Sequence, residues 1–202
     1  MFAWIYKRGQ AGNLFPAKIV RKLKGDKVMQ GQIELRNIMF DNLDSMLNLA
    51  PKQAQQPFIE PISKMISIAY AGINENCSGF LQAIYYNAQP VGAILIGKSP
   101  ISEEEPPELQ KYEYAYRIVG FFVDQNYQSK GIGRAALKLA FDKLENYPES
   151  KELPLYLECH KDNEVALSLY KLFGFLQIDH MFEDGYCVLV RFPERTNPCK
   201  NC

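Results

Sequence analysis

A short glycine-containing segment, residues 128–134, has the residue types that most clearly suggest chemistry. It follows an apolar run that ends at Val123 and precedes a stretch with helical spacing. A helix N-terminus presents unpaired backbone N–H groups and the positive end of the helix dipole, so it binds phosphate oxygens. Gly131 and Gly133 have no side chains to hold a pyrophosphate away from those amides. The segment therefore predicts an anion-binding loop, with a plain tight turn as the alternative.

The glycine spacing does not match two common nucleotide-binding motifs. A P-loop requires a Lys followed by Ser or Thr after its second glycine, and neither stands there. In a dinucleotide fingerprint, Ala136 would take the third glycine position, but no acidic residue is clearly placed to bind the ribose. Lys130 and Arg134 add positive charge beside the glycines. A phosphate site in this segment would therefore be neither a P-loop nor a dinucleotide-binding motif.

Strand and helix patterns precede this segment in the first half of the chain. In chain order they are a strand over 32–38, a helix after Asp41, a second helix from Ile62, a hairpin over 80–96 and a loop over 99–108. We expect Asp41 to cap the first helix, because Asp is a preferred N-cap residue. The hairpin turn is expected at residues 87–90, where Asn87 and Pro90 are typical turn residues.

The second half alternates between strand and helix patterns. In chain order they are a strand over 114–123, a helix over 136–144, a strand over 155–159, a helix over 166–173 and a closing strand pair over 174–178 and 186–192. The first of these strands is apolar almost throughout, so we expect it to lie centrally in the sheet. Gly174 is placed to end the last helix. This order predicts an α/β fold with a partly mixed sheet.

Composition restricts the class of protein. The 202 residues are 47% hydrophobic and carry a formal net charge of zero, which is typical of a globular protein and argues against a surface built for nucleic acid. No stretch approaches the roughly 20 apolar residues of a membrane span. The odd number of cysteines predicts reduced thiols and a cytoplasmic location. Cys199 and Cys202 are too few for a zinc site, which needs about four ligands, so we expect no metal.

Two motifs carry a resemblance to a known family. Residues 123–134 read VDQNYQSKGIGR, in which Gln128, Gly131 and Gly133 fill the defining positions of (Q/R)-x-x-G-x-(G/A). Residues 163–175 read NEVALSLYKLFGF, which matches N-x-x-A-x-x-L-Y-x-x-x-G-F. These segments have the order and separation of the acetyl-CoA signature of GNAT N-acetyltransferases. The chain therefore resembles that superfamily. The two motifs together make this resemblance more specific than either motif alone.

The resemblance implies a fold and a domain organisation. The implied fold is a mixed, mostly antiparallel sheet with one splayed strand pair, flanked by helices, within residues 31–193. Residues 1–30 lie outside the resemblance and are basic, since seven Lys and Arg oppose only Asp26. We interpret them as an N-terminal extension with either a solvated face or a partner-binding patch, and residues 194–202 as a C-terminal tail.

Acetyl-CoA is the co-substrate that the resemblance implies. Its pantetheine arm is expected to lie along the backbone of residues 121–123, in the gap between the splayed strands. The residues that the resemblance places at the cofactor are Phe121, Phe122, Val123, Gln128, Ser129, Lys130, Gly131, Ile132, Gly133, Arg134, Asn163 and Ala166. Asn163 has an alternative interpretation as a helix N-cap, and the aromatic pair also suits a core.

The resemblance also implies the chemistry, which is acetyl transfer by direct attack of an amine. Tyr170 matches the tyrosine that donates a proton to the departing thiolate, although a core aromatic is the alternative. Glu158 and Glu113 are the candidate bases, ahead of His160. Cys159 has no evident activating partner, so an acyl-cysteine route is not favoured.

The acceptor is expected to be a small-molecule amine. Residues 33–37 and 55–60, with Phe121 and Phe122, look like the bacterial diamine or spermidine acetyltransferase branch, although Val119-Gly120 stand where that branch carries a charged pair. Carboxylates suited to a polycation are Glu60, Glu103, Glu104, Glu105, Glu113 and Glu183. Aminoglycosides and protein N-termini stay open as acceptors, and so does a non-catalytic acetyl-CoA sensor. We expect no nucleic-acid or membrane partner. Members of the family often dimerise, so the resemblance leaves a homodimer open.

Overall fold

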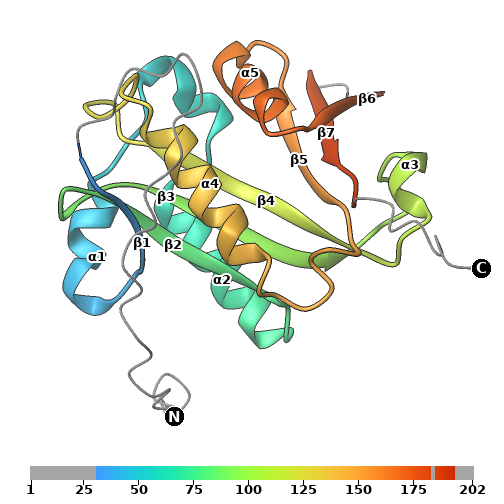
Figure 1. Cartoon of the computed structure of the whole chain (residues 1–202), viewed down its shortest axis with the longest axis horizontal. Coiled ribbons are helices and arrows are strands. Elements are labelled where there is room, and N and C mark those ends of the chain that lie inside the picture. Colours follow the sequence, from blue (N-terminus) through green and yellow to red (C-terminus); the bar gives the residue numbers. More distant parts are fainter. Residues whose placement is uncertain (1–30, 183–184, 194–202) are drawn as a thin grey trace, which may run out of the picture.

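The computed structural model describes residues 31–182 and 185–193, which contain a seven-stranded sheet in the order β1-β2-β3-β4-β5-β7-β6 (Figure 1). The strands are β1 (Ile33–Asn37), β2 (Gly79–Tyr86), β3 (Gln89–Pro100), β4 (Tyr114–Val123), β5 (Leu155–His160), β6 (Leu176–Met181) and β7 (Tyr186–Arg191). All neighbouring strands are antiparallel except β4 and β5, which are parallel. The predicted mixed, mostly antiparallel sheet and the central place of β4 are confirmed.

Helices cover both faces of this sheet. They are α1 (Phe40–Leu47), the 3-10 helix η1 (Gln53–Phe58), α2 (Ile62–Asn74), α3 (Pro107–Gln110), α4 (Ile132–Leu144) and α5 (Glu164–Leu172). On one face, α1 and α2 pack on β3 through Ala93 and Leu95. On the other face, α4 and α5 share a core with Ile94 and Ile96 (Figure 1). Alternate residues of β3 thus serve the two layers, as the period of a strand requires. No helix within the described ranges has the length and apolar character of a membrane span.

The start of α1 corrects one prediction. Met39 is the N-cap residue, and Asp41 lies in the first turn instead of capping it. The Asn42 side chain accepts a hydrogen bond from the Met39 backbone N–H at 2.8 Å, which closes the helix end two residues earlier than expected.

The β2–β3 hairpin is confirmed, but its turn is tighter than predicted. It consists of Asn87 and Ala88, with φ of 48° and 65°. Positive φ at both central residues is typical of a two-residue hairpin turn, and proline cannot adopt it. Pro90 therefore lies in β3, opposite Tyr85. The predicted loop over 99–108 is likewise shortened, by β3 at one end and by α3 at the other.

The splayed strand pair is present between β4 and β5. Only two residue pairs join these strands, Tyr116 with Leu155 and Arg117 with Tyr156. Just beyond them, the pairing of β3 with β4 slips between Leu95 and Ile96, leaving Val119 as an extra residue. A bulge bends its strand and increases the local twist. β4 therefore leaves β5 after Arg117, and a gap opens between them.

The close approach of β3 to β4 yields a prediction about two glycines of one strand. A Cβ at Gly92 would overlap the Phe122 carbonyl oxygen, whereas one at Gly97 would meet nothing within 4 Å. We expect Gly92→Ala to lower the free energy of unfolding by about 1–3 kcal/mol, because the strands must separate. Gly97→Ala is the matched control and should change it little. Equal losses in chemical denaturation would contradict this account.

Candidate active site

The gap between β4 and β5 is a groove of about 1050 Å³. Its walls come from six segments of the chain: residues 52–61 around η1, the end of β4, residues 127–134, the end of β5, α5 with its N-cap, and Tyr186 of β7. Its volume is in the range of sites for cofactors and small molecules. The two sequence motifs thus lie on one cavity.

The segment between β4 and α4 is tied to the strand end and to η1. The buried Asp124 accepts hydrogen bonds from the backbone N–H of Ala50, at 3.1 Å, and of Asn126, at 3.0 Å. Gln128 Nε2 donates to the Val123 carbonyl at 2.9 Å and to Gln55 Oε1 at 2.7 Å. The motif glutamine therefore fixes the loop that precedes the helix N-terminus.

The N-terminus of α4 faces the groove. Gly131 is its N-cap residue at φ 79°, in the left-handed region that favours glycine, and no side chain caps the helix. The amides of its first turn have no partner within the helix and remain available to an anion. Lys130 instead donates to the Asn126 carbonyl at 2.9 Å and is not among the groove-lining residues.

Gly133 is a glycine that the fold itself does not require. A Cβ there would come no closer than 3.6 Å to Phe121, 3.8 Å to Leu169 and 3.8 Å to Val123, which is ordinary van der Waals contact. Its φ does not lie in the left-handed region. Protein packing and backbone conformation therefore do not explain the glycine at this position.

Helix α5 presents Tyr170 to the opposite wall. Asn163 Oδ1 caps the helix by accepting from the Ala166 N–H at 3.3 Å, which confirms the N-cap interpretation. Gly174, at φ 83°, ends it as predicted. Tyr170 is 6% exposed, and burial, with a smaller effect of the Cys159 thiol, raises the pKa of its phenol. The phenol is therefore protonated at physiological pH and can donate a proton.

Glu158 lies where the strands part. Its Oε1 forms an ion pair with Arg117 at 2.5 Å, and its side chain is 28% exposed. Glu113, the other predicted base, is exposed and is not among the groove-lining residues, whereas His160 lines the groove and stacks on Phe58 at 4.7 Å. Sequence reasoning missed Arg117, although a cation inside the apolar run 114–123 was a visible signal.

The Cys159 thiol does not have the character of a nucleophile. Burial, together with the Cys187 thiol, raises its pKa to about 12. A thiol in that environment is neutral at physiological pH, whereas the thiolate is the reactive form.

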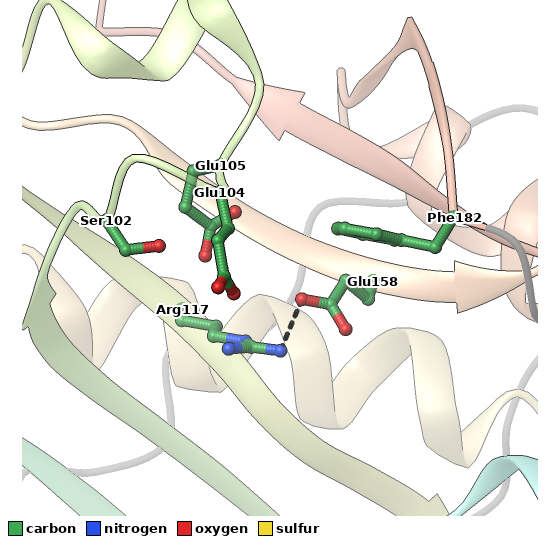
Figure 2. A pocket seen from close by; sticks show the side chains of 6 residues that line it. All are labelled: Ser102, Glu104, Glu105, Arg117, Glu158 and Phe182. Carbon is green, nitrogen blue, oxygen red and sulfur yellow. Dashed lines mark hydrogen bonds and ion pairs between the residues drawn. The ribbon is translucent and has the colours of Figure 1, made fainter.

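Most sequence-predicted site residues come together on this groove. Those that line it are Glu158, Tyr170, Phe121, Phe122, Val123, Gln128, Ser129, Gly131, Ile132, Gly133, Arg134, Asn163 and Ala166. Among the predicted carboxylates, Glu60 lines the groove, and Glu104 and Glu105 line a second cavity (Figure 2). Glu183, the tail cysteines and residues 1–30 lie outside the described residues.

Family comparison agrees with this geometry. Residues 43–175, well over half of the chain, match the model of the Acetyltransferase (GNAT) family. The chain therefore belongs to the GNAT family, and it is an N-acetyltransferase.

Two curated relatives are named for different acceptors. Spermine/spermidine N(1)-acetyltransferase of Bacillus subtilis strain 168 is 26% identical over 160 residues, which cover 79% of this chain and 97% of that protein. N-alpha-acetyltransferase RimI of Mycobacterium tuberculosis is 33% identical over 96 residues, which cover 46% of this chain and 53% of that protein.

Solved structures confirm the fold. Spermidine N-acetyltransferase from Vibrio cholerae, in complex with CoA and spermine, has a TM-score of 0.54 at 16% identity, covering 79% of this chain and 93% of that one. An acetyltransferase from Agrobacterium tumefaciens has a TM-score of 0.57 at 12% identity, covering 91% and 99%. At these identities the likeness concerns the fold alone.

Proposed function

We propose that this protein transfers the acetyl group of acetyl-CoA directly to a primary amine, with a polyamine such as spermidine as the favoured acceptor. The observation that carries the proposal is the groove itself. It combines an open helix N-terminus, an unpaired strand edge and a buried, protonated phenol. Acetyl-CoA requires these three features: a helix N-terminus for its pyrophosphate, a strand edge for its pantetheine arm and a proton donor for its departing thiolate.

In this proposal the groove holds acetyl-CoA along β4. The pyrophosphate accepts hydrogen bonds from the first amides of α4, over residues 131–134, with Arg134 adding charge. The pantetheine arm lies against residues 121–123, because β4 beyond Arg117 has no strand partner on its β5 side. Asn163 and Ala166 line the far wall.

The reaction requires two proton movements. Glu158 takes the proton from the acceptor ammonium, directly or through water, and the neutral amine attacks the thioester carbonyl. A backbone N–H at the splay stabilises the oxyanion. When the carbon–sulfur bond breaks, Tyr170 donates its proton to the leaving thiolate. Holding both substrates in one groove supplies much of the acceleration, on the order of 7–11 kcal/mol in favourable cases.

The relatives and two carboxylates of the groove support a polyamine acceptor. The Bacillus subtilis relative is named for spermine and spermidine, and the Vibrio cholerae structure contains spermine. In this chain, Glu60 and Glu158 line the groove together with the cations Lys52, Arg117 and Arg134, so these two carboxylates are the groups that would bind the ammonium groups of a polyamine. A protein N-terminus is the second candidate acceptor, because the RimI relative acts on an N-alpha-amine by name.

An amine panel tests the function. We expect thiol release from acetyl-CoA with spermidine, spermine and putrescine, and little with an aminoglycoside or short peptides. Turnover with peptides alone would replace the polyamine with a protein acceptor. Binding of acetyl-CoA in calorimetry without turnover would indicate a sensor module. The absence of both acetyl-CoA binding and turnover would refute the proposed function.

Gly133→Ala separates cofactor binding from folding. The methyl group fits the fold, and alanine favours helix over glycine by up to about 1 kcal/mol, so the melting temperature should stay level or rise. The dissociation constant for acetyl-CoA should rise about tenfold, as expected for loss of one hydrogen bond to a charged group. Gly97→Ala, at a residue that does not line the groove, is the control. Unchanged calorimetric affinity in Gly133→Ala would argue against pyrophosphate at this site.

Tyr170→Phe tests the proton donor. We expect kcat to fall about 10²-fold with little change in acetyl-CoA affinity, because the phenyl ring keeps the packing but has no proton. Burial raises the pKa of the phenol, so the protonated donor persists as pH rises. The wild-type kcat should therefore stay level between about pH 8 and pH 10, where an ordinary phenol would be half ionised. An unchanged kcat in Tyr170→Phe would contradict the donor role, and an alkaline limb near pH 9 that disappears in this variant would contradict the raised pKa.

A further inference from the structure

A second cavity, of about 380 Å³, lies beside the groove (Figure 2). It is lined by Ser102, Glu104, Glu105, Arg117, Glu158 and Phe182. Figure 2 shows Glu104 and Glu105 projecting from the segment before α3, with Arg117, Glu158 and Phe182 across from them. Sequence reasoning named Glu103, Glu104 and Glu105 among the carboxylates suited to a polycation, and the proposed reaction does not use them.

One carboxylate oxygen of Glu105, a residue that lines this cavity, has no hydrogen-bond partner. Glu105 Oε1 accepts a hydrogen bond from the Tyr156 hydroxyl at 2.9 Å. Glu105 Oε2 is buried, with less than 1 Å² of exposed surface, and has no hydrogen-bond partner. A buried carboxylate oxygen without a donor is costly. A ligand that brings N–H donors would remove this cost.

The charges of the cavity specify the ligand. Three carboxylates and one guanidinium line it, and the guanidinium is paired with Glu158. The remaining negative charge lies on Glu104 and Glu105. A primary ammonium has three N–H donors, and the acceptors around it are the two carboxylates and the Ser102 hydroxyl. The adjacent Phe182 ring offers an apolar surface for methylenes.

The position of the cavity links it to the acetyl-transfer groove. Arg117 and Glu158 line both spaces, so their ion pair lies between them. We infer that the cavity is a subsite for the second ammonium group of a diamine or polyamine, whose first amine lies at Glu158 in the groove. This inference rests on the proposed function and names what selects the acceptor. The methylene chain between the two nitrogen atoms of the acceptor runs past the Arg117–Glu158 ion pair. An acceptor with one amine has no second ammonium group and makes no charged contact in the cavity.

Calorimetry on the CoA-loaded protein tests the subsite without turnover. The probes are hexamethylenediamine, hexylamine and aminohexanoate, which differ only at the far end of the chain. We expect the diamine to bind at least tenfold more tightly than hexylamine, because a charged hydrogen bond is worth that much, and aminohexanoate to bind most weakly. In Glu105→Gln the diamine should lose this advantage while hexylamine affinity is unchanged. The glutamine keeps an acceptor for Tyr156, so the fold should persist.

Two neighbouring variants make the result specific. Glu104→Gln, at an exposed position on the same cavity, should reduce the diamine advantage in part. Glu103→Gln removes the same charge from an exposed residue that does not line the cavity, and it should leave the advantage intact. Equal binding of diamine and hexylamine by the wild type would overturn the subsite. So would an equal effect of Glu103→Gln and Glu105→Gln.

The subsite and the proposed reaction fail separately. If diamine selectivity depends on Glu105 but no amine is acetylated, the subsite stands and the proposed function falls. If both amines are acetylated with equal kcat/KM, in the wild type and in Glu105→Gln alike, the function stands and the subsite falls.

Discussion

The short parallel contact between β4 and β5 is the constraint on which the site depends. Two residue pairs hold the strands together, and the bulge at Val119 then turns β4 away. A fully paired ladder here would close the sheet and leave no groove. The cost is a stretch of backbone without a strand partner on its β5 side, in a central strand whose side chains are nearly all buried or partly buried. Such a stretch is tolerated where another chain or a ligand completes the hydrogen bonds.

The layer formed by α1, η1 and α2 is joined to the loop before α4 through a few partly buried polar contacts. Asp124 binds the backbone after α1, and Gln128 binds Gln55 in η1. Buried polar groups that are fully hydrogen-bonded favour one arrangement over others. The segment that forms one wall of the groove is therefore held by the loop that ends at α4. The two halves of the sequence meet in one site because of these contacts.

Burial gives the two walls different chemical character. Tyr170 lies among apolar side chains, which hold the phenol in its protonated form. Glu158, on the neighbouring strand, is partly exposed and faces a guanidinium, which suits a carboxylate. A proton donor and a proton acceptor can thus occur a short way apart in the fold. The same ion pair separates the groove from the acidic cavity, so the position of one arginine affects both spaces.

The sequence by itself determined the family, the elements and most of the groove lining. Gln128 and Gly131 are recognisable because the backbone needs those types locally, and Gly133 because its spacing matches the family motif. The apolar periods depend only on neighbouring residues. The tertiary structure decided which carboxylates matter. Glu113 and Glu158 look equivalent in sequence, as do Glu103 and Glu105. Only the fold places Glu158 beside Arg117 and leaves Glu105 Oε2 buried without a partner. The physical reason is that burial and charge pairing are set by strands and loops that meet across long separations, and no local pattern records them.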